Sequence, residues 1–412
     1  MRRTVLLALA IALLSMGVAT EAMTGGLYVN EFGTSSMGVA GAGANARADD
    51  ASTAFHNPAG MTRLDDHQFM GGLAAGISEI RFNSDPDTPS TSGGDGGDQG
   101  GFFPVVGSQY VHKLTDRFRL GMSLLSVSGS ALDPGDNWVG RNEVTELTLL
   151  TLTALPTLAF RATDWLSIGG GVGVTYGSID FDLRLPDPPF PLEPKIKIEN
   201  ADDFALTWTV GVLLELDPAL RFGVVYQSKT ELELDGDVKL PTGATPGIDL
   251  DIDLAQAVRM GVYWDVTDRF AVLLSAAWED WSELENIPLS VGGVGAALPI
   301  NFKDTWKGGI GFEYQLLDAL RLQTGFMWDT SPVRQKDRIA SFPIDRQFRV
   351  ATGARYNYSD ALTMSVSFVY IDLGKSKLNT GNLKGHYNQN RAFVLGFNMQ
   401  WKQLPWGGRG TW

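Results

Sequence analysis

Residues 359–372 read SDALTMSVSFVYID, and this stretch decides the fold class. A Ser-Asp turn leads into a strand with large apolar side chains on one face, namely Leu362, Met364, Val366, Phe368 and Tyr370. The opposite face carries Thr363, Ser365 and Ser367. Because successive side chains of a β-strand point to opposite faces, the pattern predicts one apolar face and one small polar face. A strand with lipid on one side and a wet lumen on the other has this pattern.

The same phrase, an Asp in a short turn followed by an alternating strand, recurs along the chain at Asp116, Asp164, Asp217, Asp268, Asp318 and Asp360. The strands between these turns are joined by longer stretches rich in Gly, Pro and Asp, at 83–101, 128–145, 184–200, 235–247, 284–298, 331–345 and 375–388. These seven hairpins predict an all-β, 14-stranded antiparallel transmembrane β-barrel with short turns at one end and long loops at the other. A propeller or solenoid would also repeat, but one hairpin is too little for a propeller blade. A soluble sandwich would have shorter strands.

Aromatic residues lie near both ends of the predicted strands. Phe118, Trp165, Phe222, Trp264, Phe270 and Tyr358 are next to the short turns, and Trp138, Trp281 and Trp328 lie toward the long loops. We therefore expect two aromatic girdles at the two lipid interfaces.

Residues 1–22, MRRTVLLALAIALLSMGVATEA, have the pattern of a secretory signal peptide. Arg2 and Arg3 precede a short apolar run, and small residues follow it up to Ala22. The run is shorter than the roughly 20 residues of a transmembrane helix, which is the alternative interpretation. We therefore predict export to the bacterial outer membrane, with cleavage between Ala19 and Thr24.

Composition excludes several functions. The 412 residues include 33 Lys and Arg against 47 Asp and Glu, a net charge of −14, which argues against a nucleic-acid partner. The absence of Cys excludes disulfides, thiolate zinc sites and cysteine nucleophiles. The four His residues lack metal-binding spacing, and GGGVGV at 169–174 lacks the phosphate-binding form, so we expect its glycines to pack against a plug or a neighbouring strand. We predict no cofactor, no metal and no enzymatic activity.

The segment 23–65 does not alternate and is rich in Gly, Ala and Ser. Residues 38–48 are compatible with a helix that 49–54 can continue, and Asn57-Pro58 should end it because the residue before Pro avoids the α region. The apolar residues of this segment need burial, which favours a plug in the lumen over a loose tail. We therefore divide the chain into a signal peptide (1–22), an N-terminal hatch (23–65), the barrel (66–401) and a C-terminal tail (402–412).

Several phrases resemble the FadL-type outer-membrane transporters of long-chain fatty acids and aromatic hydrocarbons. They are NEF at 30–32, GVAGAG at 38–43, ADDAST at 48–53, NPAGM at 57–61, WVGR at 138–141, YQSK at 226–229, DTW at 304–306 and GFMWDTSPV at 325–333. The resemblance spans essentially the whole chain after the signal peptide. It implies a 14-stranded barrel plugged by its N-terminal segment, with passive uptake of a hydrophobic small molecule and lateral exit into lipid.

The resemblance also implies site residues. The hatch or gate is Asn30, Glu31, Phe32, Asn57, Pro58 and Ala59, and Leu27 and Tyr28 reach the ligand pocket. A kink in the third strand is expected at Ser128, Gly129 and Ser130, where small residues permit a bulge, although the strand could simply run into its loop there. Lys307, Arg321, Arg349 and Arg355 are candidate lumen charges for a carboxylate, with a structural role as the alternative.

Two other functions stay open from the sequence. A general porin would conduct water-soluble solutes, and a barrel phospholipase would need a Ser–His pair that no local motif marks. The expected partners are the solute, outer-membrane lipid and lipopolysaccharide, and we expect a monomer.

Overall fold

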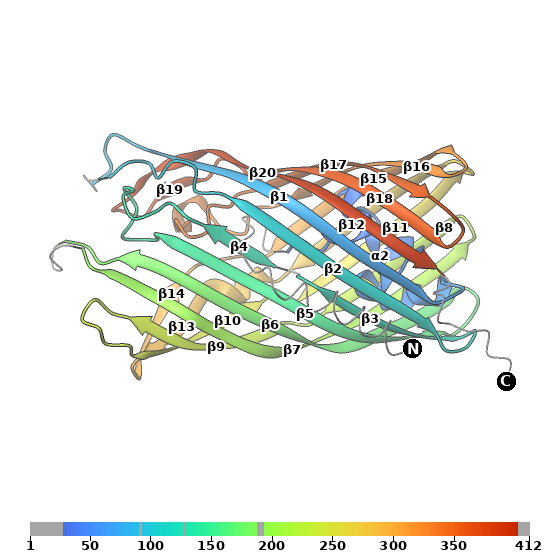
Figure 1. Ribbon diagram of the computed structural model, residues 1–412, viewed down its shortest axis with the longest axis horizontal. Coiled ribbons are helices and arrows are strands. Elements are labelled where there is room, and N and C mark those ends of the chain that lie inside the picture. Colours follow the sequence, from blue (N-terminus) through green and yellow to red (C-terminus); the bar gives the residue numbers. More distant parts are fainter. Residues whose placement is uncertain (1–27, 90–92, 127, 188–192, 403–412) are drawn as a thin grey trace.

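The computed structural model describes residues 28–89, 93–126, 128–187 and 193–402, which form one closed antiparallel barrel (Figure 1). The predicted signal peptide, Leu27 and almost all of the predicted C-terminal tail lie outside these residues. The wall has the predicted 14 strands, and β1 closes it by pairing with both β2 and β20. Several wall strands consist of two segments with separate labels, which follow each other along the same strand.

In order around the wall, the strands are β1 (Gln68–Ser84), β2 (Phe102–Lys113), β3 (Phe118–Leu125) with β4 (Gly129–Leu132), β5 (Glu146–Arg161), β6 (Leu166–Arg184), β7 (Lys195–Asp217), β8 (Leu220–Gln227) with β9 (Thr230–Lys239), β11 (Ala257–Thr267) with β10 (Gly247–Leu254), β12 (Phe270–Glu279) with β13 (Asn286–Val291), β15 (Thr305–Leu317) with β14 (Val294–Pro299), β16 (Leu320–Asp329), β17 (Gln347–Asn357), β18 (Leu362–Asp372) with β19 (Lys377–Asn379), and β20 (Lys384–Lys402). Two short 3-10 helices lie between strands, η3 (Trp281–Glu285) and η4 (Gln335–Asp337).

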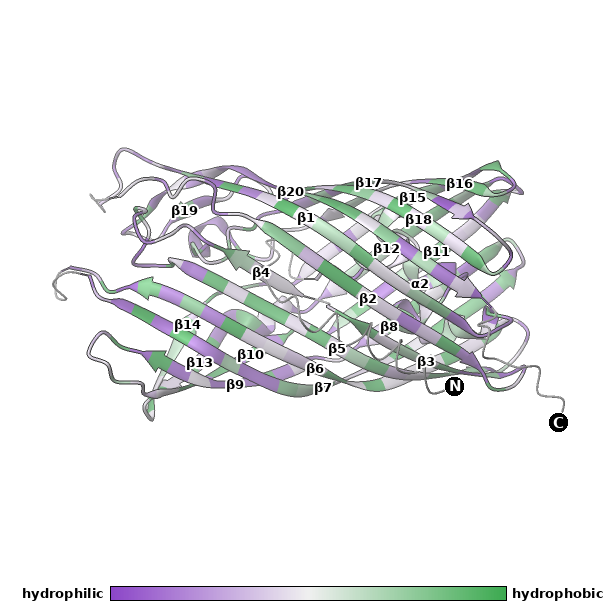
Figure 2. Ribbon diagram, in the orientation of Figure 1, coloured by the Kyte–Doolittle hydropathy of each residue, from purple (hydrophilic) through white to green (hydrophobic). Residues whose placement is uncertain are grey.

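Part of what we expected to be irregular loop is strand. The stretch 284–298 contains β13 and most of β14, which pair with each other, and 375–388 contains β19, which pairs with β20. These segments continue the hydrogen-bonded ladders of the wall beyond the end where the predicted long loops lie. The barrel therefore extends well past its apolar band (Figure 2).

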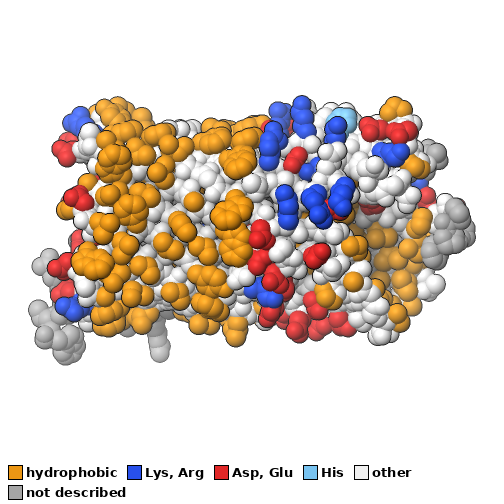
Figure 3. Space-filling view, turned by 180° about the vertical axis from the view of Figure 1, so that it is seen from behind, with side chains coloured by type: hydrophobic (Ala, Val, Ile, Leu, Met, Phe, Trp, Pro, Cys, Tyr) orange, Lys and Arg blue, Asp and Glu red, His pale blue; other side chains and the backbone are white. Residues whose placement is uncertain are grey.

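The alternation of side chains is confirmed where the sequence predicted it. On β18, Thr363, Ser365 and Ser367 are buried in the interior, whereas Val366 is 48% exposed on the outside. On β20, Leu395 and Phe397 point outward. The outside of the wall therefore presents a broad apolar band (Figure 3).

Toward the long-loop end the two faces exchange their polarity. On β1 the outward residues change from Leu73 and Ile77 to Glu79 and Arg81, while Ile80 faces inward and is buried. On β9 and β10 the outward residues are acidic and the inward ones apolar, with Leu232, Leu234, Ile248, Leu250 and Ile252 buried. Figure 3 shows the resulting charged band beside the apolar one. The outer half of the barrel thus has an apolar interior and a solvated exterior.

The N-terminal segment, residues 28–64, lies inside the barrel toward the short-turn end (Figure 1). It contains η1 (Ser35–Val39), α2 (Ala44–Arg47), α3 (Thr53–His56) and η2 (Pro58–Arg63). The predicted continuous helix over 38–54 is wrong, because Ala40 and Ala48 have left-handed backbone (φ 52° and 47°) and break it. The predicted end at Asn57-Pro58 is confirmed, since Asn57 is extended with φ −158°.

A small-residue belt lines the wall around this segment, with one Gly, Ser or Thr from every wall strand. Its members are Gly72, Gly107, Gly121, Thr157, Gly169, Gly211, Gly223, Gly261, Ser275, Gly311, Gly325, Gly353, Ser367 and Gly396. A Cβ on Gly223 would collide with the carbonyl of Asn45, and one on Gly325 with the backbone of Val39. A Cβ on Gly169 would meet Pro58 and Ala59, as expected for a glycine that packs against a plug. The belt therefore lets the backbone of the N-terminal segment lie directly against the wall.

The third wall strand is interrupted. β3 ends at Leu125 and pairs with β2 only over Gly107–Lys113, while β4 pairs with β5. Among the described residues, neither β3 nor β4 pairs with residues 102–106 of β2. The other edge of that part of β2 pairs with residues 73–77 of β1, where Leu73 and Ile77 face outward in the apolar band. The wall therefore lacks one backbone ladder at the height of the lipid-facing residues.

Candidate functional site

The interior of the outer half is an apolar compartment. Its buried residues form one cluster that includes Ile80, Phe82, Leu125, Trp138, Leu147, Leu232, Leu250, Trp281, Ile287, Phe302, Ile344 and Tyr387. Trp138 and Trp281 are fully buried in it, so their predicted place in an aromatic girdle is wrong. Trp328 is 39% exposed on the outside. The two other Trp side chains turn inward because the wall has exchanged its polarity at that height.

Tyr28 connects the N-terminal segment to this compartment. Its ring centre lies 5.0 Å from that of Trp281, and its hydroxyl donates to the carbonyl of Ala255 at 2.6 Å. The guanidinium of Arg259 lies 5.1 Å from the centre of the same ring. Tyr28 thus forms part of the floor of the apolar compartment, and its role as a pocket residue stays a prediction.

Beneath Tyr28 lies the Arg349 cluster, which consists of Glu31, Arg259, Glu279, Lys307, Asp329 and Arg349. Arg349 contacts Glu31 at 2.6 Å and Asp329 at 3.0 Å, and it also donates to the carbonyl of Tyr28 at 3.2 Å. Lys307 contacts Glu279 at 3.0 Å. The cluster joins Glu31 and Tyr28 of the N-terminal segment to five wall strands, β11, β12, β15, β16 and β17.

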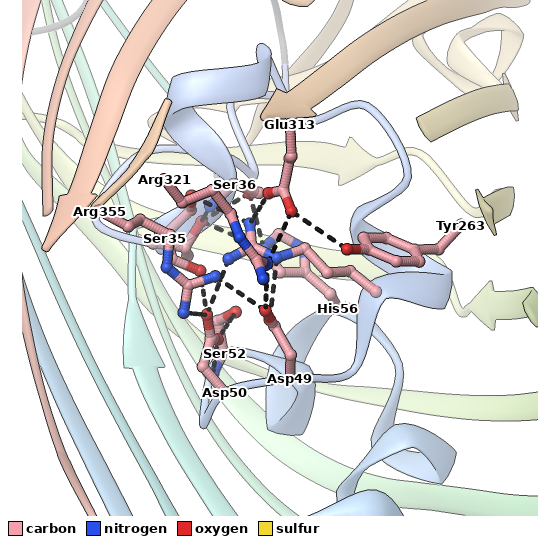
Figure 4. Close-up of polar contacts among 12 residues, drawn as sticks. Ser35, Ser36, Asp49, Asp50, Ser52, His56, Tyr263, Glu313, Arg321 and Arg355 are labelled. Atoms are coloured by element: carbon pink, nitrogen blue, oxygen red, sulfur yellow. Dashed lines mark hydrogen bonds and ion pairs between the residues drawn. The ribbon is translucent and has the colours of Figure 1, made fainter. Parts of the chain in front are cut away.

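Closer to the short turns lies the Arg47 cluster, which consists of Arg47, Asp49, Asp50, Glu313, Arg321 and Arg355 (Figure 4). Arg47 contacts Asp49 at 2.8 Å, Asp50 at 3.3 Å and Glu313 at 3.6 Å. From the wall, Arg355 reaches Asp49 at 2.9 Å. Burial, with the positive charges of Arg259 and Arg47, lowers the pKa of His56 to about 3. His56 is therefore neutral beside this cluster, 3.1 Å from the hydroxyl of Ser36.

Each cluster contains three cations and three carboxylates, so each is electrically balanced. The four predicted lumen charges are divided between them, with Lys307 and Arg349 in one cluster and Arg321 and Arg355 in the other. All four contact carboxylates of the protein itself. Sequence reasoning missed Arg47, Arg259, Glu279 and Asp329, although polar residues on the inward face of strands are a usable signal for such clusters.

The predicted hatch residues lie at contacts with the wall. In the orientation of the Asn30 amide that satisfies its hydrogen bonds, the oxygen accepts from Nε of Arg259 at 3.2 Å. Phe32 is buried. The amide of Asn57 donates to the carbonyl of Val212 on β7 at 3.1 Å. Pro58 and Ala59 lie against Gly169 on β6. Asn57 therefore contacts the wall on β7, away from the interrupted third strand.

Ser128 lies in the interruption of the third strand, and Gly129 and Ser130 are the first two residues of β4. They line a pocket together with Ile80 and Leu149 from the wall and residues 342–344 from the long loop after β16. The carbonyl of Pro343 in that loop accepts from the hydroxyl of Ser376 at 2.9 Å and from the amide of Asn390. Ile80, Leu149 and Ile344 also belong to the buried apolar cluster, so the pocket adjoins the apolar compartment.

In the part of the chain that the structure describes, no group of His, Asp and Glu residues is arranged to hold a metal ion. No helix of the described residues has the length and apolar character needed to cross a membrane.

Comparisons with known proteins agree with this architecture. A family model described as "Outer membrane protein transport protein (OMPP1/FadL/TodX)" matches residues 15–402. The chain is 25% identical to the "Long-chain fatty acid transport protein" of Salmonella typhi, over 96% of this chain and 97% of that protein. It is 23% identical to "Outer membrane protein P1" of Haemophilus influenzae, over 90% of this chain and 94% of that protein.

Two solved structures share the fold. A FadL homologue from Pseudomonas aeruginosa superimposes with a TM-score of 0.84 at 20% identity, covering 92% of this chain and all of that one. The toluene transporter TodX of P. putida superimposes with a TM-score of 0.66 at 15% identity, covering 85% of this chain and 94% of that one.

Proposed function

Because the chain belongs to the OMPP1/FadL/TodX family of outer membrane transport proteins, we propose that it takes up long-chain fatty acids or aromatic or aliphatic hydrocarbons passively, with lateral exit into lipid. Its family consists of transport channels of the outer membrane and not of enzymes. The observation that carries the proposal is the apolar compartment inside the solvated outer half of the barrel. Each CH₂ group that moves from water into such a compartment gains about 0.8 kcal/mol.

The interrupted third strand supports the sideways exit. The pocket at Ser128–Ser130 adjoins the apolar compartment, and the missing ladder beside β2 lies at the height of Leu73 and Ile77, which face outward in the apolar band. A solute that leaves there enters lipid without returning to water, so the step needs no energy source. Lipid then surrounds the apolar band, lipopolysaccharide the charged band above it, and the transporter acts as a monomer.

The N-terminal segment acts as a hatch in this proposal. It fills the lumen at the height of the small-residue belt, and both ion clusters join it to the wall. Because each cluster is balanced, the hatch can be seated without leaving a buried charge unpaired. A closed hatch keeps water-soluble molecules out while the apolar route above it stays available.

Cells that lack their own transporter should gain uptake of oleate or of an alkylbenzene when they express this protein. Uptake of a small sugar should not rise, and liposomes carrying the purified protein should not swell in that sugar, because the hatch fills the lumen. Radiolabelled uptake and light scattering measure the two effects. Swelling without uptake of any apolar solute would favour a general porin, and release of fatty acid from phospholipid would favour a phospholipase.

A bulky residue in the pocket beside β4 should slow the exit. Ser130→Trp places an indole between Leu149 and the loop at 342–344, so we expect uptake to fall several-fold at equal surface expression. The matched control is Ala131→Trp, because Ala131 is the next residue of β4 and does not line the pocket. Equal uptake by both variants and the wild type would show that solute leaves by another path.

A further inference from the structure

A group of exposed cations lies on the outside of the barrel, directly beyond the apolar band. We call it the basic patch, and it consists of Arg346, which precedes β17, and of Lys375 and Lys377 at the start of β19. Figure 3 shows Lys and Arg side chains gathered on one part of the charged band, whereas Asp and Glu gather on another. The patch is therefore locally positive on a chain whose net charge is −14.

The wall brings the three cations of the basic patch together. A Cβ on Gly374 would lie 3.3 Å from Nη1 of Arg346, so the guanidinium lies over the residue that precedes Lys375. Lys375 and Lys377 are both exposed, and Ser376 between them is buried. Because side chains alternate along an extended chain, the two Lys residues share the outward face. Residues far apart in the sequence thus form one positive surface.

The charge of the basic patch is not neutralised by the protein. Among the described residues, none of its three side chains forms an ion pair with a carboxylate. The carboxylates that are close to them in the sequence have other partners. Asp345 contacts Arg338 at 3.1 Å, and Asp372 accepts from the backbone N–H of Gly374 at 2.9 Å. The cations are therefore available to an anionic group from outside the chain.

The same strands carry outward apolar side chains beside the basic patch. The guanidinium of Arg346 lies 5.0 Å from the ring centre of Phe348, and Val350 follows on the same face of β17 with 48% exposure. On β18, Val366 and Phe368 are 48% and 43% exposed. Arg346 is two residues beyond Phe348, which is about 7 Å along an extended strand. This surface fits a molecule whose acyl chains lie against the band and whose anionic groups lie a few ångströms beyond it.

We propose that the basic patch binds the phosphate groups of lipopolysaccharide, the glycolipid of the outer leaflet. Its acyl chains cover the apolar band beside Phe348, and its phosphates contact Arg346, Lys375 and Lys377. Cations at this height attract anionic lipid headgroups. The acidic outside of β9 and β10 repels phosphate, so the lipid binds one side of the barrel in preference to the other. The inference rests on the placement of lipopolysaccharide in the proposed function and is independent of the solute.

The binding test titrates the purified protein with phosphorylated lipid A, the acylated anchor of lipopolysaccharide, and native mass spectrometry measures the apparent Kd. EDTA in the buffer prevents divalent cations from bridging phosphate to the acidic side chains. We expect Lys375→Gln/Lys377→Gln to raise the Kd at least about tenfold, because each cation near a headgroup contributes several-fold to binding. Adding Arg346→Gln should raise it further, and Lys375→Arg/Lys377→Arg should retain binding. Lipid A without phosphates should bind the wild type as weakly as phosphorylated lipid A binds the double Gln variant.

The matched control is Arg117→Gln/Arg269→Gln. It also removes two exposed cations, but these lie at the short turns, at the other end of the barrel. It should retain the wild-type Kd, and all variants should keep the wild-type Tm because the substituted side chains are exposed. An unchanged Kd in the double Lys→Gln variant, or an equal rise in the control, would overturn the proposal. Phosphatidylglycerol that binds as tightly as lipid A would overturn the assignment to lipopolysaccharide.

Lipid binding and transport can fail separately. Uptake of oleate or an alkylbenzene by a protein whose lipid A binding does not depend on the basic patch rejects the lipid site and retains the proposed function. Patch-dependent binding of lipid A by a protein that transports no apolar solute retains the lipid site and rejects the proposed function.

Discussion

Gly325→Val should convert the closed barrel into a conducting one. The Cβ of any residue at 325 would overlap the backbone of Val39, which cannot move without shifting the hatch as a whole. Overpacking of this kind costs about 1–3 kcal/mol or more when side chains alone absorb it, and here the obstacle is backbone. The barrel should stay folded, because its strands are held by ladders that do not include the hatch. We therefore expect a steady conductance in planar bilayers that the wild type lacks.

The control for this experiment is Gly308→Val on β15. Gly308 lies in a strand adjacent to β16, but a Cβ there would meet no atom within 4 Å. It introduces the same side chain into the same part of the wall without touching the hatch. A Gly325→Val protein that is as closed as the Gly308→Val protein would mean that the hatch adapts to the clash, and that the small-residue belt does not determine how it is seated.

Arg47→Met should release the hatch by a different route. The side chain of Arg47 is 4% exposed and contacts three carboxylates, of which Glu313 belongs to the wall. Removing one partner of a buried ion pair costs about 3–5 kcal/mol, because the remaining charge is left unpaired. A difference of that size changes the ratio of released to seated hatch by a factor of about a hundred or more. Channel openings in bilayers should become correspondingly more frequent.

Two comparisons make this result specific. Arg47→Lys keeps the charge but loses the planar fork, so its openings should be intermediate in frequency. Lys384→Met removes the partner of the exposed Asp87, a surface ion pair that contributes little to stability, and should leave the channel closed. Equal behaviour of Arg47→Met and Lys384→Met would show that the Arg47 cluster does not hold the hatch.

The barrel was predictable because its signal is local. Leu362, Val366 and Phe368 alternate with Ser365 and Ser367 within a single strand, and that alternation depends only on strand geometry. The lumen charges on the wall could be predicted, but their partners could not, because Arg47 meets Glu313 and Asp49 meets Arg355 only after the wall has closed around the segment. Trp138 and Trp281 were misplaced for a related reason. A Trp near the end of a strand suits a lipid interface and a buried core equally well, and only the exchange of polarity along the wall decides between them.

The predicted helix over residues 38–54 is absent because of long-range packing as well. Local propensity favours a helix through the Ala-rich run, yet Ala40 and Ala48 adopt left-handed backbone. The chain bends there to follow the curved inner wall, and contacts with Gly311, Gly325 and Gly223 compensate for the strain. Long-range packing therefore outweighs propensity at these two positions.

The exchange of polarity along the wall also bears on how the protein is assembled. The acidic tip formed by β9 and β10 ends up on the far side of the bilayer from the periplasm, where folding of an exported chain begins. Each carboxylate on that tip is costly to expose to hydrocarbon. Insertion must therefore proceed through hairpins that cross while their charged ends are shielded from the acyl chains. The apolar core of the outer half can then form only after translocation, so membrane insertion precedes the packing of that core.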